Sequence, residues 1–154
     1  MIDRPSPNYA PRPAGTDIDV LVLHYTELPL KESLDVLSDP QRPLKVSAHY
    51  VLAEDGTLYR LVPEDRAAWH AGRSYWRGRE ALNASSIGIE IVNLHGDQHD
   101  YPPLQVGALI ALCREIIARH PAILPRNVVT SGGSGPVRRR YPSSARSSGG
   151  SAAS

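Results

Sequence analysis

Short apolar segments at intervals along the chain predict strands. Residues 18–24 and 87–92 are dominated by Ile, Val and Leu and are too short for helices, so each predicts a buried strand. Residues 49–53 and 57–62 predict a hairpin, because the Asp-Gly pair between them suits the positive φ angles of a tight turn. The two valines at 128–129 predict the start of a further strand.

Two longer segments have the apolar spacing of amphipathic helices. Residues 30–37 carry leucines on one helical face and end before Pro40. Residues 104–120 carry a continuous apolar stripe and end at Pro121. Strands and helices in this order predict an α/β fold, in which helices flank a mixed central β-sheet.

The composition changes near both ends of the chain. Residues 1–17 contain four prolines and predict an extended Pro-rich arm. Residues 18–129 contain all the predicted elements and form the predicted domain. Residues 130–154 consist almost entirely of Ser, Gly, Arg, Ala and Pro, without an acidic residue, so they predict a disordered low-complexity tail.

Composition also excludes several classes of function. The net charge of +1 gives no reason to expect a nucleic acid partner, and no apolar run approaches the roughly 20 residues of a membrane-spanning helix. The single cysteine excludes an internal disulfide and a zinc site built from several cysteines. The first residues lack the apolar stretch of a secretion signal, so the expected location is the cytoplasm; a periplasmic or cell-envelope location requires a start codon upstream of Met1.

Two polar residues stand out in the predicted buried strands. His24 closes the first strand, where its ring can face a cleft, although a core-edge histidine bonded to backbone is the ordinary alternative. Glu90 has apolar neighbours, and a buried carboxylate is costly unless it is paired or functional. Strand alternation places Glu90 on the same face as Gly88, which leaves room for a ligand. Two roles would explain a glutamate in a buried strand: it is a general base in catalysis, or it forms an ion pair with an arginine.

The segment between residues 64 and 86 adds two candidates. It shows no helical or strand period, and structureless loops of this length are usually functional. His70 precedes two small residues that let a substrate approach; the alternative is an exposed histidine in a loop anchored by Trp69. The amide of Asn83 can bind an amide-bearing substrate, or the residue can simply form a turn.

Four motifs occur in an order that is more specific than any one of them. They are LHYT at 23–26, VSAHYVLAEDGTLYRLVPEDRAAWHAG at 46–72, LNASSIGIEIVN at 82–93 and LPRNVV at 124–129. Together they resemble the type 2 N-acetylmuramoyl-L-alanine amidases, zinc enzymes related to the peptidoglycan recognition proteins. The resemblance covers roughly residues 18–129.

The resemblance implies a fold, a reaction and roles for individual residues. The implied reaction is hydrolysis of the amide between N-acetylmuramic acid and L-alanine in peptidoglycan or its fragments. By motif position, His24 is implied as a zinc ligand and Glu90 as the general base that activates water. His70 and Asn83 are implied to line the substrate groove. One zinc ion is the implied cofactor, which lowers the pKa of its bound water and polarises the scissile carbonyl.

The chain departs from this family after Val129. Family members continue with a second zinc-binding His, then a Pro-Arg-Lys stretch and a third ligand, usually Asp. No His or Asp follows His120 here, so two of the three expected protein ligands are absent. We interpret the break in composition as a disrupted reading frame. A true truncated relative is one alternative, and replacement of a ligand by His49 or His70 is another.

These observations lead to two functions. The first is zinc-dependent amidase activity, impaired in this chain by the missing ligands. The second is non-catalytic binding of peptidoglycan or muropeptide in a groove around His70 and Asn83. A third possibility is that the chain is a fragment that does not fold stably. The sequence leaves the oligomeric state, the preferred stem peptide and any requirement for an anhydro sugar open.

Overall fold

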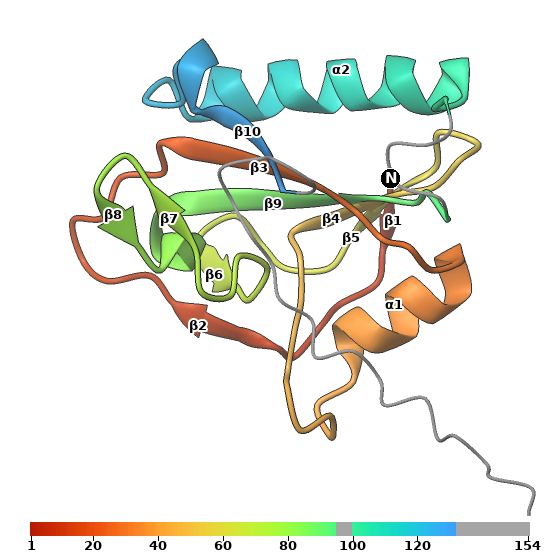
Figure 1. The fold of residues 1–154 in the computed structure, drawn as a ribbon, viewed down its shortest axis with the longest axis horizontal. Helices are drawn as coiled ribbons and strands as arrows, with labels where there is room; N and C mark the ends of the chain where they lie inside the picture. Colours follow the sequence, from red (N-terminus) through yellow and green to blue (C-terminus); the bar gives the residue numbers. More distant parts are fainter. Residues whose placement is uncertain (95–99, 132–154) are drawn as a thin grey trace, which may run out of the picture.

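The computed structural model describes residues 1–94 and 100–131, and its centre is a six-stranded sheet (Figure 1). The strands lie in the order β1-β5-β4-β9-β3-β10. Their bounds are Ile2–Asp3 (β1), Val20–Tyr25 (β3), Tyr50–Leu52 (β4), Leu58–Arg60 (β5), Ser86–Ile91 (β9) and Val128–Ser131 (β10). All the strands predicted from the sequence are present, with small shifts at their ends.

The sheet is mixed, which confirms the predicted fold class. β4 and β5 form the predicted antiparallel hairpin, whereas β9 runs parallel to both of its neighbours, β3 and β4. β10 adds a further parallel strand beside β3. In parallel strands the carboxyl ends meet at one edge of the sheet, which is the usual place for functional side chains in α/β proteins.

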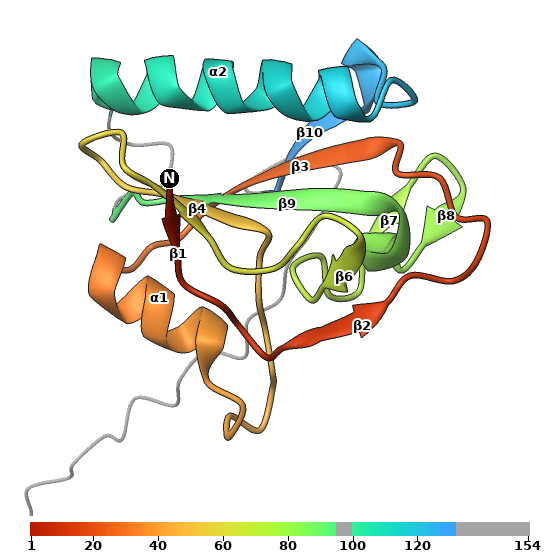
Figure 2. The ribbon, with the colours of Figure 1, turned by 180° about the vertical axis from the view of Figure 1, so that it is seen from behind.

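Helix α2 covers one face of the sheet. It spans Pro103–Arg119 and lies along this face in both views (Figure 1 and Figure 2). The predicted apolar stripe makes the contact, because Leu112 and Ile116 are buried in one cluster with Leu21 and Ile89 of the strands. Full burial of such a side chain stabilises a fold by about 1.5–3 kcal/mol. The apolar residues that predicted this helix are therefore the ones that pack it against the sheet.

A second helix and several short elements lie on the opposite face. They are α1 (Leu30–Ser38), β6 (Arg66–Ala68) and the 3-10 helix η1 (Leu82–Ser85). Leu37 of α1 packs in one cluster with Val92, and Val20 and Val22 of β3 pack with Leu82 of η1. Because side chains of a strand alternate between faces, the next even-numbered residue of β3, His24, projects from this face.

The segment between residues 64 and 86 is more ordered than predicted. Instead of a structureless loop it contains β6, η1 and a small antiparallel hairpin. The strands of the hairpin are Tyr75–Trp76 (β7) and Arg79–Glu80 (β8). Strands of two or three residues are too short to produce a recognisable hydrophobic period, so the sequence pattern could not reveal them.

The Pro-rich arm is extended, as predicted, but the structure integrates it into the fold. β1 pairs in parallel with β5, and β2 (Tyr9–Pro11) pairs antiparallel with β6. The arm is also tied to the body by buried polar side chains. Ser6 Oγ donates to the Leu37 carbonyl at 2.6 Å, and Asn8 Nδ2 donates to the Val46 carbonyl at 3.1 Å. Residues 1–17 therefore pack as part of the domain, although the sequence predicted a domain boundary after residue 17.

At the other end, the valines at 128–129 begin β10, which continues to Ser131, beyond the predicted end of the domain. The remainder of the predicted tail, from residue 132, lies outside the described residues. Within the residues that are described, no helix has the length and apolar character needed to cross a membrane.

Candidate active site

His24 and Glu90 lie side by side on the face of the sheet opposite α2. They are register partners on the neighbouring parallel strands β3 and β9, so their side chains project from the same face. Both are buried, with exposed fractions of 2% and 1%. The structure thus brings the predicted zinc ligand and the predicted general base together, although 65 residues separate them in the sequence.

His70 completes a buried group on this face. Its ring lies against Gly88 of β9: a Cβ built on Gly88 would fall within 2.7 Å of the His70 ring atoms Cγ, Nδ1 and Cδ2. Only glycine at this position lets the ring approach the strand so closely. The sequence suggested that Gly88 leaves room for a ligand, but the space is taken by a histidine of the same chain.

A continuous line of hydrogen bonds joins the two histidines to serines at either end. Ser131 Oγ of β10 bonds to Nδ1 of His24. Nε2 of His24 lies 3.0 Å from Nδ1 of His70, and Nε2 of His70 lies 2.9 Å from Ser86 Oγ. Neither serine was predicted as a site residue. Nothing in the local sequence indicates that the first residue of β9, Ser86, and the last residue of β10, Ser131, lie beside the two histidines.

Asn83 holds the backbone on which His70 lies. Its Oδ1 accepts hydrogen bonds from the N–H groups of His70 at 3.2 Å and Ala71 at 2.8 Å. This side chain therefore fixes the position of the Trp-His-Ala-Gly segment against η1. His70 itself has an exposed fraction of 0%. The substrate contacts expected for His70 and Asn83 stay predictions, but both residues already have defined partners within the protein.

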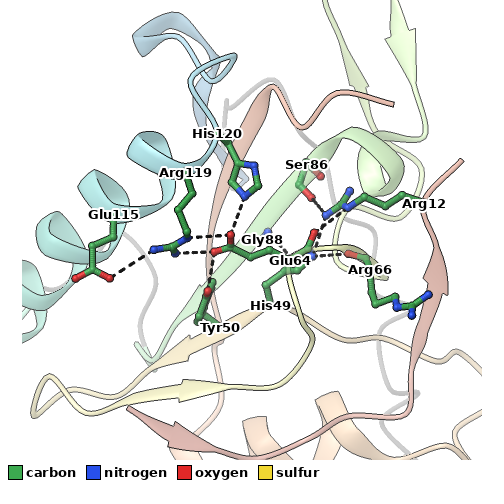
Figure 3. A network of polar contacts seen from close by, with 10 residues as sticks. All are labelled: Arg12, His49, Tyr50, Glu64, Arg66, Ser86, Gly88, Glu115, Arg119 and His120. Carbon is green, nitrogen blue, oxygen red and sulfur yellow. Dashed lines mark hydrogen bonds and ion pairs between the residues drawn. The ribbon is translucent and has the colours of Figure 1, made fainter. Parts of the chain in front are cut away.

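His49 is buried among hydrogen-bonding partners of its own. Its Nδ1 accepts a bond from the Gly88 N–H at 3.0 Å, and its Nε2 lies 3.0 Å from the Arg66 carbonyl (Figure 3). Burial lowers the pKa of His49 to about 4, so the ring is neutral at physiological pH. Both ring nitrogens serve the core, which agrees with a packing histidine and leaves neither for a metal.

Arg12 is a further residue that sequence analysis missed. Its guanidinium group donates to the carbonyls of Asn83 at 3.1 Å, Ser86 at 2.9 Å and Glu64 at 3.0 Å, and also to that of Ala84. Burial lowers the pKa of Arg12 to about 10, so it remains charged at neutral pH. The Pro-rich arm thus carries a cation that bonds η1 and the start of β9, where the hydroxyl of Ser86 contacts His70.

A second polar network ties the end of α2 to the strands (Figure 3). The Glu64 carboxylate accepts bonds from Tyr50 at 2.7 Å and Arg119 at 2.8 Å, and it lies 2.7 Å from Nε2 of His120. Burial alone would raise the pKa of Glu64, but the bonds from Arg119, Tyr50 and His120 outweigh it and hold the pKa at about 2. The network stabilises the end of α2 against the strands.

The described residues do not form a zinc site. Among residues 1–94 and 100–131, no three His, Cys, Asp or Glu side chains are grouped closely enough to hold a metal ion. A zinc site in a protein needs at least three such ligands, and His24 is the one predicted ligand in this part of the chain. Ser131 stands beside it, and a serine hydroxyl is not among the usual ligands of zinc.

Comparison with known sequences gives a consistent result. Residues 14–144 match the N-acetylmuramoyl-L-alanine amidase family. The chain is 41% identical over 140 residues to the N-acetylmuramoyl-L-alanine amidase AmiD of Escherichia coli K12, covering 81% of this chain and 49% of AmiD. It is 38% identical over 135 residues to the 1,6-anhydro-N-acetylmuramyl-L-alanine amidase AmpD of Salmonella typhimurium LT2, covering 77% of this chain and 71% of AmpD. The chain therefore spans about half the length of AmiD.

Solved structures agree with the sequences. A crystal structure of AmpD has a TM-score of 0.72 at 34% identity, covering 84% of this chain and 79% of AmpD. The complex of E. coli AmiD with anhydro-N-acetylmuramic acid-L-Ala-D-γ-Glu-L-Lys has a TM-score of 0.65 at 38% identity, covering 77% of this chain and 51% of AmiD. On the matched sequence, the shared fold and the relatives at these identities, the chain belongs to the N-acetylmuramoyl-L-alanine amidase family.

Proposed function

We propose that this chain hydrolyses the amide bond between N-acetylmuramic acid and L-alanine in peptidoglycan fragments, at a rate far below that of a family member with a full set of metal ligands. The observation that carries the proposal is the register pairing of His24 with Glu90 on one face of the sheet. Membership in the amidase family supports the class of reaction. The pairing supports a role for Glu90 in activating water beside His24, the zinc ligand that the family resemblance implies.

Glu90 acts as the general base in this proposal. Its carboxylate takes a proton from the attacking water while the oxygen bonds to the scissile carbonyl carbon, and the proton is then returned to the nitrogen of the departing L-alanine. One water molecule is consumed, and the products are a free carboxyl group on the muramic acid and a free amino group on the peptide. The burial of Glu90 keeps bulk water from competing for its hydrogen bonds.

The low rate follows from the small number of side chains that could bind zinc. Members of this family are generally zinc-dependent, and the described residues offer His24 without the two partners that a zinc site requires. The stabilisation of developing negative charge on the carbonyl oxygen, usually a large part of catalysis, is therefore weak. We expect the purified chain to carry much less than one zinc ion per molecule.

The substrate class is supported by what the relatives bind. The AmiD structure contains an anhydro-muropeptide, and a structure of AmpDh3 from Pseudomonas aeruginosa, with 38% identity, contains an anhydromuramic pentapeptide. We extend this class of ligand to the present chain as part of the proposal. The contacts of His70 and Asn83 described above then shape the floor of the site beneath the ligand.

The test is a cleavage assay with anhydro-N-acetylmuramic acid-L-Ala-D-γ-Glu-L-Lys, in which the released peptide is quantified by mass spectrometry. The chain and its Glu90→Gln variant are compared at equal concentration, and bound zinc is measured by elemental analysis. We expect slow release of the intact peptide by the parent chain and a rate at least about a hundredfold lower for Glu90→Gln. Isothermal titration with the same ligand shows whether binding is unchanged in the variant.

Four outcomes would count against the proposal. Release that is equally fast in Glu90→Gln would remove the assigned base, and cleavage at another bond would remove the reaction class. Saturable binding without any release, even at high enzyme concentration, would instead favour a muropeptide-binding module. One zinc ion per molecule together with rapid turnover would contradict the inferred loss of the metal site.

A further inference from the structure

A cavity of about 350 Å³ lies on the α2 face of the sheet, opposite the face from which His24 projects. Its floor includes Arg60 of β5 and Tyr50 of β4, which are register partners and so project from the same face. Tyr50 packs in one cluster with Leu112 of α2, so this pair faces the helix. The volume is at the lower end of the range for ligand pockets and therefore suits a small molecule.

One side of α2 forms the wall of this cavity. Leu112, Glu115 and Arg119 follow one another at intervals of three and four residues, so they lie on the same side of the helix, and all three line the cavity. Leu112 gives the wall an apolar part, and Pro63, before the buried part of the 64–86 segment, adds a second apolar surface. The cavity therefore combines apolar contacts with charged groups from both the helix and the sheet.

Both arginines of the cavity have a terminal nitrogen that the protein does not use. Arg60 directs Nε and Nη2 to the Asp3 carboxylate, each at 2.8 Å. Arg119 directs Nε and Nη2 to Glu64, at 3.2 and 2.8 Å. Among the residues that the structure describes, neither Nη1 atom donates a hydrogen bond, and that of Arg119 lies 3.8 Å from Glu115, beyond hydrogen-bond distance. Guanidinium groups with free N–H donors bind carboxylates well.

Glu115 supplies a charge of the opposite sign. Its side chain is 68% exposed, and its contact with Arg119 is the loose one at 3.8 Å (Figure 3). The other carboxylate of the cavity, on Glu64, already accepts bonds from Tyr50 and Arg119 and contacts His120. Glu115 is therefore the carboxylate of this cavity that can still bind an ammonium group.

We propose that this cavity is a second binding site, which takes a small apolar α-amino acid in its zwitterionic form. The Nη1 groups of Arg60 and Arg119 bind the carboxylate, and Glu115 binds the ammonium group. Leu112 and Pro63 contact the apolar side chain. A zwitterion matches these charges better than a simple anion does, because Glu115 would repel a carboxylate that brought no cation with it. The inference does not rest on the proposed amidase function.

The proposal is tested with three probes that differ in their charges. They are L-leucine, L-leucinamide, which lacks the carboxylate, and N-acetyl-L-leucine, which lacks the ammonium group. Each is titrated into the ¹⁵N-labelled full chain and followed by ¹H–¹⁵N correlation spectra with assigned backbone signals. We expect L-leucine to bind saturably in the millimolar range, because so small a ligand makes few contacts. We expect binding about tenfold weaker for L-leucinamide and about threefold weaker for N-acetyl-L-leucine.

Variants of two exposed residues separate the contributions of the two charges. Arg60→Gln should narrow the difference in affinity between L-leucine and L-leucinamide, because one of the two guanidinium groups is lost. Glu115→Gln should narrow the difference between L-leucine and N-acetyl-L-leucine. Arg4→Gln is the matched control: Arg4 also forms an exposed ion pair, with Asp35 at 3.4 Å, but it does not line this cavity. Circular dichroism confirms that each variant is folded.

The parent chain alone can overturn the proposal. No saturable binding of L-leucine in the millimolar range, or equal affinity for the three probes, would do so even if no variant folds. Shifts confined to the signals around His70 and Gly88 would place the ligand on the other face of the sheet and would also overturn it. Unchanged discrimination in folded Arg60→Gln and Glu115→Gln would contradict the assigned contacts. Failure to cleave muropeptide would count against the proposed function alone.

Discussion

Ser131 is the register partner of His24, and its hydroxyl bonds to Nδ1 of the imidazole. On the other side of β3, Glu90 is the register partner of the same histidine. His24 is therefore flanked in one row by a carboxylate on β9 and a hydroxyl on β10. Because this row crosses three parallel strands, each side chain is placed by backbone pairing rather than by a loop.

Replacing Ser131 with histidine should strengthen zinc binding. The substitution places a second imidazole directly beside His24, where the family resemblance implies a further ligand after the strand containing Val128 and Val129. We expect zinc affinity to rise by at least about tenfold, measured by competition with a chromophoric chelator. Thr130→His is the control, because side chains alternate along β10 and Thr130 is exposed. Equal zinc affinity in the two variants would contradict the placement of Ser131.

Gly88→Ala should destabilise the protein and displace His70. The added methyl group would overlap the His70 ring, and overpacking of this kind typically costs about 1–3 kcal/mol. The measurement is the free energy of unfolding from urea titration. Gly107→Ala in α2 is the matched control: nothing lies within 4 Å of its built Cβ, and alanine favours a helix by about 0.5–1 kcal/mol. Similar free energies for both variants would show that the His70 ring is not in contact with β9.

Arg12→Ala should destabilise the fold although the residue lies in the Pro-rich arm. The substitution leaves the carbonyls that Arg12 bonds without their donor, and we expect a loss of about 3 kcal/mol in unfolding free energy. Arg12→Lys should recover only part of this loss, because an ammonium group cannot reproduce the planar fork of the guanidinium. Chemical denaturation provides the values for both variants.

Arg4→Ala is the matched control for the arm. Arg4 forms an exposed ion pair with Asp35 at 3.4 Å, and exposed pairs contribute little. We expect a change within about 0.5 kcal/mol. An equal effect of the two substitutions would mean that Arg12 contributes no more than a surface charge, and that the arm is not locked to η1 and β9 by its guanidinium group.

Glu64→Gln should reduce stability at neutral pH but not in strong acid. The pKa of Glu64 in the folded protein is about 2, below its ordinary value of 4.5, so the ionised carboxylate stabilises the fold above pH 4.5. This stabilisation is lost as the pH falls from 4.5 toward 2. We expect the parent chain to exceed the variant by about 2 kcal/mol at pH 7, with the difference disappearing near pH 2.

The measurement is urea unfolding at a series of pH values. Glu54→Gln serves as the control, since Glu54 is exposed in the turn between β4 and β5 and should alter the unfolding free energy by no more than about 0.5 kcal/mol. A difference between the parent and Glu64→Gln that is constant over the whole pH range would contradict the role of the bonds from Tyr50, Arg119 and His120.

Sequence patterns were reliable where a residue's role depends on its neighbours in the chain. The apolar stripe of α2 predicted the side that packs on the sheet, because burial follows the helical period. The Asp-Gly turn predicted the β4–β5 hairpin. Short strands gave no such signal, and the segment between residues 64 and 86 was therefore predicted as a loop although it contains β6, β7 and β8.

The sequence by itself determined the class of fold, the family and the identity of the buried carboxylate, since these depend on local hydrophobic patterns and on motifs in a given order. Only the tertiary structure decided that Glu90 and Ser131 flank His24, that His70 lies on Gly88, and that Arg12 bonds the start of β9. These relationships join residues far apart in the chain. Strand register and the packing of distant segments create them, and no local sequence pattern encodes either one.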